Sequence, residues 1–286
     1  MSYPSAYLLL SHGSRDPRPQ AAMDALAERF AQKIAYAGLQ SLATGGEGTI
    51  ANDPSGLTAA PLPATATIEC EPPVGTAFLE CHPLPLHQQI EQFCGTVQSS
   101  FTTVGTGSTK PCKIAILPLF LLPGVHVMDD IPQEIALAQE ALGDAIELDL
   151  RPAIGSHPGL HRLVTECMAT QPVEAWILLA HGSRRSNGNQ PVEDLAERLG
   201  TLTAYWSVSP SLESRLQELS QLGIRQIGIL PYFLFAGGIT DAIAQTVETL
   251  SQQFPTLKLH LVPPLAATEL TDLLVDLAQD EAEDKR

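Results

Sequence analysis

Positive charge is scarce in this sequence. Its 16 lysines and arginines stand against 32 aspartates and glutamates, which gives a formal net charge of −16 at pH 7. Nucleic acids and anionic membrane surfaces are bound through basic faces, so this balance argues against both kinds of partner. An arginine near a candidate site in such a chain is therefore informative.

The sequence also lacks the patterns of a membrane protein and of a disulfide-linked protein. Its longest apolar stretch, 114–128, is interrupted by two prolines and a glycine and is too short to span a bilayer. No basic segment precedes the first apolar run, as one does in a signal peptide. The five cysteines form no CxxC pair. We therefore expect a reduced cytoplasmic protein without a disulfide scaffold or a zinc site.

One short sequence motif occurs twice. Residues 8–15 read LLLSHGSR and residues 177–184 read ILLAHGSR, which places His12 and His181 169 residues apart (181 − 12). The same offset aligns LAER at 26–29 with LAER at 195–198. This internal duplication predicts two related domains, residues 1–170 and 171–286.

Both halves alternate predicted strands with predicted helices. Apolar runs predict the strands, and apolar residues at helical spacing follow them. This order is typical of a parallel sheet that is covered on both faces. We predict an α/β fold of two tandem flavodoxin-like domains, each with a four-stranded parallel sheet, related by a pseudo-dyad with a cleft between them. The strands expected in the first half are 7–10, 76–79, 113–122 and 145–150.

Two segments interrupt this pattern, at about 38–74 and 99–111. They contain much Gly, Thr, Ala and Pro but few large apolar residues. Such a composition buries too little surface to offset the entropy lost on ordering, so we predict two mobile insertions. The second half is shorter at the same two places, which supports the alignment of the halves.

Three polar residues of the first half follow predicted strands: His12, Glu80 and His126. The carboxyl ends of parallel strands lie at one edge of a sheet, so we expect these side chains to gather there. Two imidazoles and a carboxylate suit a divalent first-row metal ion such as Co²⁺ or Fe²⁺. They equally suit proton removal, because imidazole titrates near neutrality. Each residue alone is compatible with an ordinary loop position, and their coincidence favours a site.

The second half keeps only part of this set. It retains His181 but has Ser207 opposite Glu80, and Ile239 opposite His126. We therefore predict that the chemistry is confined to the first half and that the second half forms the other wall of the cleft.

The histidine loops also carry arginines. On an acidic chain, Arg15 and Arg184 suggest a ligand that bears carboxylates or phosphates. Arg18 and Arg185 are interpreted as solvated loop charges.

Four further residues lie near predicted helix starts. Pro132 suits a first helical turn. Asp129 and Asp130 could assist a metal ion, but capping of that helix is the simpler interpretation of Asp130. For His157, contact with a ligand and a local capping role stay equally open.

Together these motifs resemble the sirohydrochlorin chelatases, class II chelatases that insert Co²⁺ or Fe²⁺ into sirohydrochlorin. The resemblance lies in HGSR at 12–15, FLE at 78–80, PLFLLPGVH at 118–126 and DIP at 130–132. It covers both halves apart from the insertions and the C-terminal tail. Short members of that family pair as homodimers and long members fuse two copies. This chain is similar to the long form, which implies a monomer with internal pseudo-dimeric symmetry.

The resemblance implies that His12 and His126 are the catalytic and metal-binding histidines, with Glu80 as the supporting acid. It implies sirohydrochlorin and a divalent ion as substrates, no permanently bound cofactor, and a role in the synthesis of sirohaem or a cobalamin-type cofactor. Because sirohydrochlorin is a polycarboxylate, it explains arginines at the site. The expected substrate-binding residues are Ser14, Arg15, Gly124, His157, His181 and Arg184.

Three other functions compete with this one. A non-catalytic carrier of tetrapyrrole or metal would use the same ligands, and it stays the alternative. Histidine phosphatases carry an arginine directly before the histidine, where this chain has Ser11. A nucleotide-binding flavodoxin-like module is disfavoured, because neither histidine loop is rich enough in glycine to cradle a phosphate.

Overall fold

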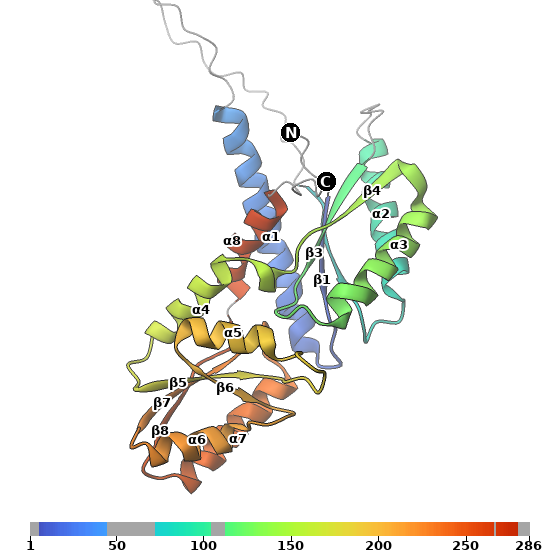
Figure 1. The fold of residues 1–286 in the computed structure, drawn as a ribbon. Helices are drawn as coiled ribbons and strands as arrows, with labels where there is room; N and C mark the ends of the chain where they lie inside the picture. Colours follow the sequence, from blue (N-terminus) through green and yellow to red (C-terminus); the bar gives the residue numbers. More distant parts are fainter. Residues whose placement is uncertain (1–5, 45–71, 104–111, 266, 280–286) are drawn as a thin grey trace, which may run out of the picture.

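The computed structural model describes residues 6–44, 72–103, 112–265 and 267–279. These residues form two four-stranded parallel sheets with helices on their faces (Figure 1). The first sheet has the order β2-β1-β3-β4 and the second the order β6-β5-β7-β8. The predicted α/β fold of two similar parallel sheets is thereby confirmed. The strands are β1 Ala6–Ser11, β2 Val74–Phe78, β3 Cys112–Pro118, β4 Ile146–Leu150, β5 Ala175–Ala180, β6 Leu202–Tyr205, β7 Gln226–Pro231 and β8 Lys258–Leu261.

Each strand leads into helical structure that returns the chain to the start of the next strand. The α-helices are α1 Pro17–Thr44, α2 Leu86–Thr103, α3 Ile131–Leu142, α4 Gly159–Ala169, α5 Gln190–Leu199, α6 Leu212–Gln221, α7 Gly238–Gln253 and α8 Ala267–Gln279. The short elements are a π-helical turn η1 His126–Asp130 and two 3₁₀ turns, η2 Gly143–Ala145 and η3 Ile154–Ser156. None of the helices in the described ranges is long and apolar enough to cross a membrane.

The strand register repeats the duplication that the sequence indicates. In the first sheet, Leu10 of β1 pairs with Pro118 of β3. In the second sheet, Leu179, which lies 169 residues after Leu10, pairs with Pro231 in the same way. The two sheets therefore place corresponding residues at corresponding positions, so the halves can be compared residue by residue.

The two halves share one hydrophobic core. Figure 1 shows α8 beside α1 of the first half and α4 beside α5 of the second half. One continuous cluster of buried side chains includes Phe30 from α1, Leu178 from β5 and Leu274 from α8. An ion pair between Lys33 and Asp272 also joins α1 to α8. The last helix of each half thus packs against the other half, which fixes the two sheets relative to each other.

Several predicted boundaries are wrong. Residues 38–44 continue α1, because Leu, Gln and Ala favour helix and no proline interrupts them. Residues 99–103 likewise continue α2, and residue 74 begins β2. The remaining parts of the predicted insertions, 45–71 and 104–111, lie outside the described residues.

The strand predicted at 113–122 is also shorter than expected. β3 ends at Pro118, after which the backbone leaves the sheet. The carbonyl of Phe120 accepts a hydrogen bond from the Gly155 N–H, and Gly124 N–H donates to the Leu122 carbonyl. These bonds form the loop that carries the chain from β3 to His126.

Candidate metal centre

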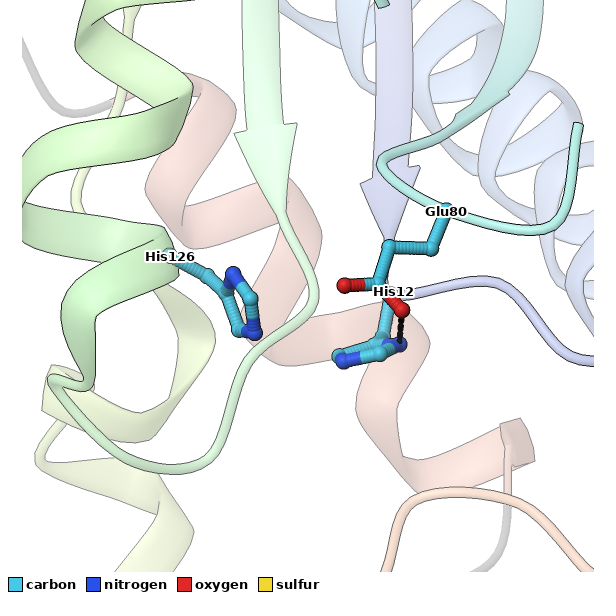
Figure 2. A group of neighbouring side chains, drawn as sticks. All are labelled: His12, Glu80 and His126. Carbon is cyan, nitrogen blue, oxygen red and sulfur yellow. Dashed lines mark ion pairs between the residues drawn. The ribbon is translucent and has the colours of Figure 1, made fainter.

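His12, Glu80 and His126 lie together at the carboxyl edge of the first sheet, as Figure 2 shows. One ligand atom from each residue lies within 4.8 Å of the other two. The imidazole rings meet edge to face, with centroids 4.9 Å apart and planes at 89°. His12 Nδ1 lies 3.9 Å from Glu80 Oε2. The structure therefore brings together the three residues that the strand ends single out.

Gly13 allows the loops of His12 and Glu80 to approach each other. Its φ of +92° lies in the left-handed region, and a Cβ at this position would lie 2.0 Å from the Glu80 carbonyl oxygen. The Glu80 N–H donates to the His12 carbonyl at 2.8 Å. The glycine of the HGSR motif therefore has a steric reason: any side chain there would push Glu80 away from His12.

The second half has the same backbone arrangement and keeps His181, but it lacks the carboxylate. The Ser207 N–H donates to the His181 carbonyl at 2.9 Å, which is the bond that joins Glu80 to His12 in the first half. The hydroxyl of Ser207 also donates to the His181 carbonyl. Ser207 thus stands in the place of Glu80, and a serine hydroxyl turned toward the backbone provides no acidic ligand there.

His126 owes its position to an extra residue in η1. The corresponding prolines at the ends of β3 and β7, Pro118 and Pro231, are 113 residues apart in the sequence (231 − 118). The first buried residues of the helices that follow, Ile131 and Ile243, are only 112 residues apart (243 − 131). The first half therefore has one residue more in this connection. One inserted residue is what turns α-helix into a π-helical turn, and such turns are frequent at functional sites. Comparison of the two halves contains this signal, but alignment from the prolines alone misses it.

Asp130 is not the helix cap that the sequence suggests. Its φ and ψ of −67° and −47° are helical, and its side chain makes no capping bond. Instead, its Oδ2 lies 2.7 Å from His126 Nδ1. The π-helical turn continues directly into α3, so Asp130 lies inside continuous helical structure. Its side chain contacts that of His126, which lies one turn before it. Pro132 does lie in the first turn of α3, as predicted.

The arrangement has the chemistry of an open metal site. A carboxylate bonded to one ring nitrogen of a histidine leaves the other nitrogen as the ligand atom. The side chains remain accessible, with exposed fractions of 52% for His12, 53% for Glu80 and 37% for His126. Donor atoms that share an ion lie about 3–4 Å apart, so small side-chain rotations complete the set. Three protein ligands leave further positions for a substrate.

The arginines near the two histidine loops differ in whether they form ion pairs. Within the described ranges, Arg15 and Arg184 are exposed and form no ion pair. The interpretation of Arg18 as a solvated charge is wrong, because its Nη2 lies 2.6 Å from Asp16 and 2.6 Å from Asp241. These hydrogen bonds from Arg18 lower the pKa of Asp16 to about 2 and also lower the pKa of Asp241. Arg18 thus joins the His12 loop to helix α7 of the second half.

The other expected substrate contacts lie at several places around the edge. The Ser14 hydroxyl accepts a bond from the Asp16 N–H. Gly124 is exposed, and a side chain at this position would contact nothing. His181 is exposed in the second half.

His157 has the local role that its place near a helix start suggests. Its Nδ1 accepts a hydrogen bond from the Gly159 N–H at 3.0 Å at the start of α4. Its side chain is only 9% exposed, yet it borders a hollow between the two halves. The local bond is therefore present, and a ligand contact stays a prediction.

The predicted cleft corresponds to a hollow of about 570 Å³ between the two halves. It adjoins the metal centre through Phe120, whose ring centroid lies 6.5 Å from that of His12, and through Val127, which follows His126. A second, smaller hollow of about 300 Å³ is bordered by Glu80, His126 and Asp130. The residues of the larger hollow are 120–123, Val127, Met128, Ala153, 155–158, Leu160, His161, Gln190, Pro191, Asp194, Leu195, Arg198 and Tyr232.

Comparison with known proteins agrees with this duplicated fold. The family model CbiX matches the chain twice, at residues 65–171 and 175–282. The chain belongs to the CbiX family, in a form with two copies of the domain.

Two curated relatives are sirohydrochlorin chelatases from Priestia megaterium. A sirohydrochlorin ferrochelatase is 26% identical over 62% of this chain and 74% of its own length. A sirohydrochlorin cobaltochelatase is 24% identical over 52% of this chain, which spans about half (53%) of that relative's length. Among solved structures, SirB from Bacillus subtilis with Fe³⁺ has a TM-score of 0.63 at 19% identity, covering 96% of this chain and 94% of SirB. That likeness shows the fold.

Proposed function

We propose that this protein inserts a divalent metal ion, Co²⁺ or Fe²⁺, into sirohydrochlorin. The observation that carries the proposal is the cluster of His12, Glu80 and His126, with ligand atoms within 4.8 Å of one another beside a hollow. The curated relatives support it, because they are a ferrochelatase and a cobaltochelatase for sirohydrochlorin. With iron the product leads to sirohaem, and with cobalt to a cobalamin-type cofactor.

The reaction exchanges one metal ion for two pyrrole protons. The ion must lose bound water, and the nearly planar ring must deform so that its nitrogens can reach the ion. His12 and His126 hold the incoming ion or take the protons, and Glu80 assists them. Imidazole suits both tasks, since it binds borderline metal ions and accepts protons near neutral pH.

Asp130 determines which nitrogen of His126 does this work. Its carboxylate accepts a hydrogen bond from Nδ1–H, with 2.7 Å between Oδ2 and Nδ1, so Nε2 is left free as a ligand or base. The neighbouring carboxylate of Glu80 provides the negative charge that favours a cation at the same place. The remaining proposed residues bind the substrate: Ser14, Arg15, Gly124, His157, His181 and Arg184.

Turnover distinguishes this function from that of a carrier. Sirohydrochlorin in large excess over protein is mixed with Co²⁺ or Fe²⁺ under anaerobic conditions, and metallation is followed by absorbance. A chelatase completes many turnovers per chain and exceeds the rate with metal alone. A carrier binds about one equivalent and then stops. A rate equal to that of the metal alone contradicts the proposal.

A further inference from the structure

The loop that carries Glu80 is one residue longer than its counterpart in the second half. The corresponding strands β2 and β6 end at Phe78 and Tyr205, which are 127 residues apart (205 − 78). The helices that follow begin at the buried residues Leu86 and Leu212, which are only 126 residues apart (212 − 86). The first half therefore differs from the second half at the loop that supplies the acid of the metal centre.

The longer loop changes how the end of β2 is held. In the second half, the Tyr205 N–H donates to the Pro210 carbonyl at 2.8 Å, so the backbone of the loop itself closes the turn. In the first half, the corresponding N–H of Phe78 donates to the side-chain Oε1 of Gln89 at 3.0 Å. A side chain of α2 therefore takes the place that a backbone carbonyl has in the second half.

The Gln89 amide connects the two ends of this loop. Its Nε2 donates to the Phe78 carbonyl at 2.8 Å and to the Leu84 carbonyl at 2.9 Å. Gln89 is only 8% exposed, and a buried amide is tolerated where its hydrogen bonds are made. With the bond from the Phe78 N–H, both the oxygen and the nitrogen of the amide are satisfied. One buried side chain thus fixes the backbone at residues 78 and 84, on either side of Glu80.

The Glu80 carboxylate depends on its backbone for its position. Its side chain is 53% exposed, and its Oε2 lies 3.9 Å from His12 Nδ1 (Figure 2). On one side the backbone is held to β1, because the Glu80 N–H donates to the His12 carbonyl. On the other side the chain turns at Cys81, whose φ of +60° is uncommon for a residue with a side chain, and enters the segment that Gln89 closes. The loop of Glu80 is thus held between β1 and Gln89.

We propose that Gln89 is a positioning residue of the metal centre. By closing the loop between residues 78 and 84, it holds the Glu80 carboxylate where that group can share a metal ion with His12 and His126. The inference rests on the proposed function and deepens it, since Gln89 is not a ligand and acts through the backbone of the loop. Loss of its hydrogen bonds should therefore weaken metal binding through Glu80.

Binding of Co²⁺ to the metal-free protein tests the proposal, measured by isothermal titration and by the visible absorption of the bound ion. Gln89→Met keeps the length of the side chain but removes all three hydrogen bonds. We expect Co²⁺ affinity to fall by about tenfold, the lower end of the usual effect of losing a supporting contact, and the absorption spectrum to change.

Arg215→Met is the matched control for this substitution. Arg215 lies 126 residues after Gln89 (215 − 89), at the corresponding position of α6, and its Nε donates to the Thr203 carbonyl of β6 at 2.9 Å. It therefore also joins a helix to the neighbouring strand, but in the half that lacks the carboxylate. We expect Arg215→Met to bind Co²⁺ with wild-type affinity and with the wild-type spectrum.

A double-mutant cycle distinguishes positioning of Glu80 from a general structural role. In a Glu80→Gln background the carboxylate is absent, so Gln89→Met should cause no further loss of Co²⁺ affinity. The same loss with and without the Glu80 carboxylate overturns the inference. Thermal unfolding checks that each variant is folded. If Gln89→Met does not fold, Gln89→Glu replaces it in the cycle, because it keeps the size of the side chain and the acceptor for the Phe78 N–H.

Failure of this inference is distinguishable from failure of the proposed function. If Gln89→Met binds Co²⁺ and metallates sirohydrochlorin as well as wild type does, Gln89 has no positioning role and the proposed function stands. If wild type itself binds no Co²⁺, the metal centre on which both rest is contradicted.

Discussion

At the scale of single residues, the proposed mechanism depends most on the contact between His126 and Asp130. A histidine that serves as ligand or base needs one defined nitrogen free, and a carboxylate on the other nitrogen ensures this. The spacing of four residues permits the contact on any helix. From the sequence alone, a helix cap is the simpler interpretation of Asp130, because Asp followed by a proline-containing turn is typical of a helix start.

Replacement of Asp130 by asparagine should impair the site without unfolding the protein. The amide keeps the size of the side chain but removes the charge, and it can donate to Nδ1 and so shift the proton to Nε2. We expect affinity for Co²⁺ and turnover to fall by about 10–100-fold, the usual effect of losing such a partner. Isothermal titration with Co²⁺ measures the first effect and the chelatase assay the second.

Asp129→Asn is the control for this experiment, since Asp129 is adjacent and exposed but does not contact the histidine in the same way. Nitrogen-15 spectra of labelled histidine report the tautomer of His126 directly. If the Asp130→Asn and Asp129→Asn proteins bind Co²⁺ equally and show the same tautomer, Asp130 has no positioning role.

At the scale of elements, the π-helical turn η1 is a feature that distinguishes the first half from the second half within the described residues. An α-helix rotates about 100° per residue, so one residue more or less turns every side chain before it to a new direction. In the first half the extra residue directs His126 toward His12 while α3 keeps its buried face. In the second half, α7 begins at Gly238 without such a turn in the described structure.

Deletion of Met128 should convert η1 to regular helix. Met128 is exposed, so its loss removes little buried surface, and the residue count then equals that of the second half. We expect the fold to persist, with His126 rotated away from His12 and metal insertion lost. Circular dichroism and thermal unfolding check the fold, and the chelatase assay checks activity. Full activity in a folded deletion variant would show that the π-helical turn does not position His126.

The sequence was sufficient for much of this architecture and for the central side chains. The spacing of the apolar residues and the internal duplication predict both sheets. Because the carboxyl ends of parallel strands lie at one edge of a sheet, the strand ends predict that His12, Glu80 and His126 lie close together. The role of Asp130 and the ion pair of Arg18 with Asp241 could not be predicted in the same way. For the first, helix capping was an equally simple interpretation of the same aspartate, and the second depends on how two distant segments pack.

At the scale of the whole molecule, the two halves contact each other in two places. One is held by the ion pair between Arg18 and Asp241, and the other contains the hollow of about 570 Å³. Arg18 connects Asp16 beside the His12 loop with Asp241 on α7, and core packing by the exchanged helices α4 and α8 completes the connection. The ion pair and the helix packing together hold the two halves in a fixed arrangement.

This connection should make stability depend on pH in the acid range. The pKa of Asp16 is lowered to about 2 and that of Asp241 is lowered as well, both by hydrogen bonds from Arg18. Because these pKa values are lower in the folded than in the unfolded state, the stabilisation is present above about pH 4 and is lost as pH falls toward 2. Arg18→Met should therefore show a shallower loss of thermal stability between pH 5 and pH 2.5 than wild type.

Arg162→Met, which removes an exposed arginine paired with Glu166 on α4, is the matched control and should keep the wild-type slope. Thermal midpoints measured across this pH range decide the comparison. Parallel curves for wild type and Arg18→Met would mean that the ion pair between the halves does not contribute to acid stability.

The central claim is that one site, in the first half, inserts the ion. Its most direct test is the number of turnovers per chain with sirohydrochlorin in excess, measured for wild type, His126→Ala and His181→Ala. The account predicts that wild type and His181→Ala turn over many times and that His126→Ala does not exceed the metal-only rate. An active His126→Ala protein together with an inactive His181→Ala protein would contradict it and place the chemistry in the second half.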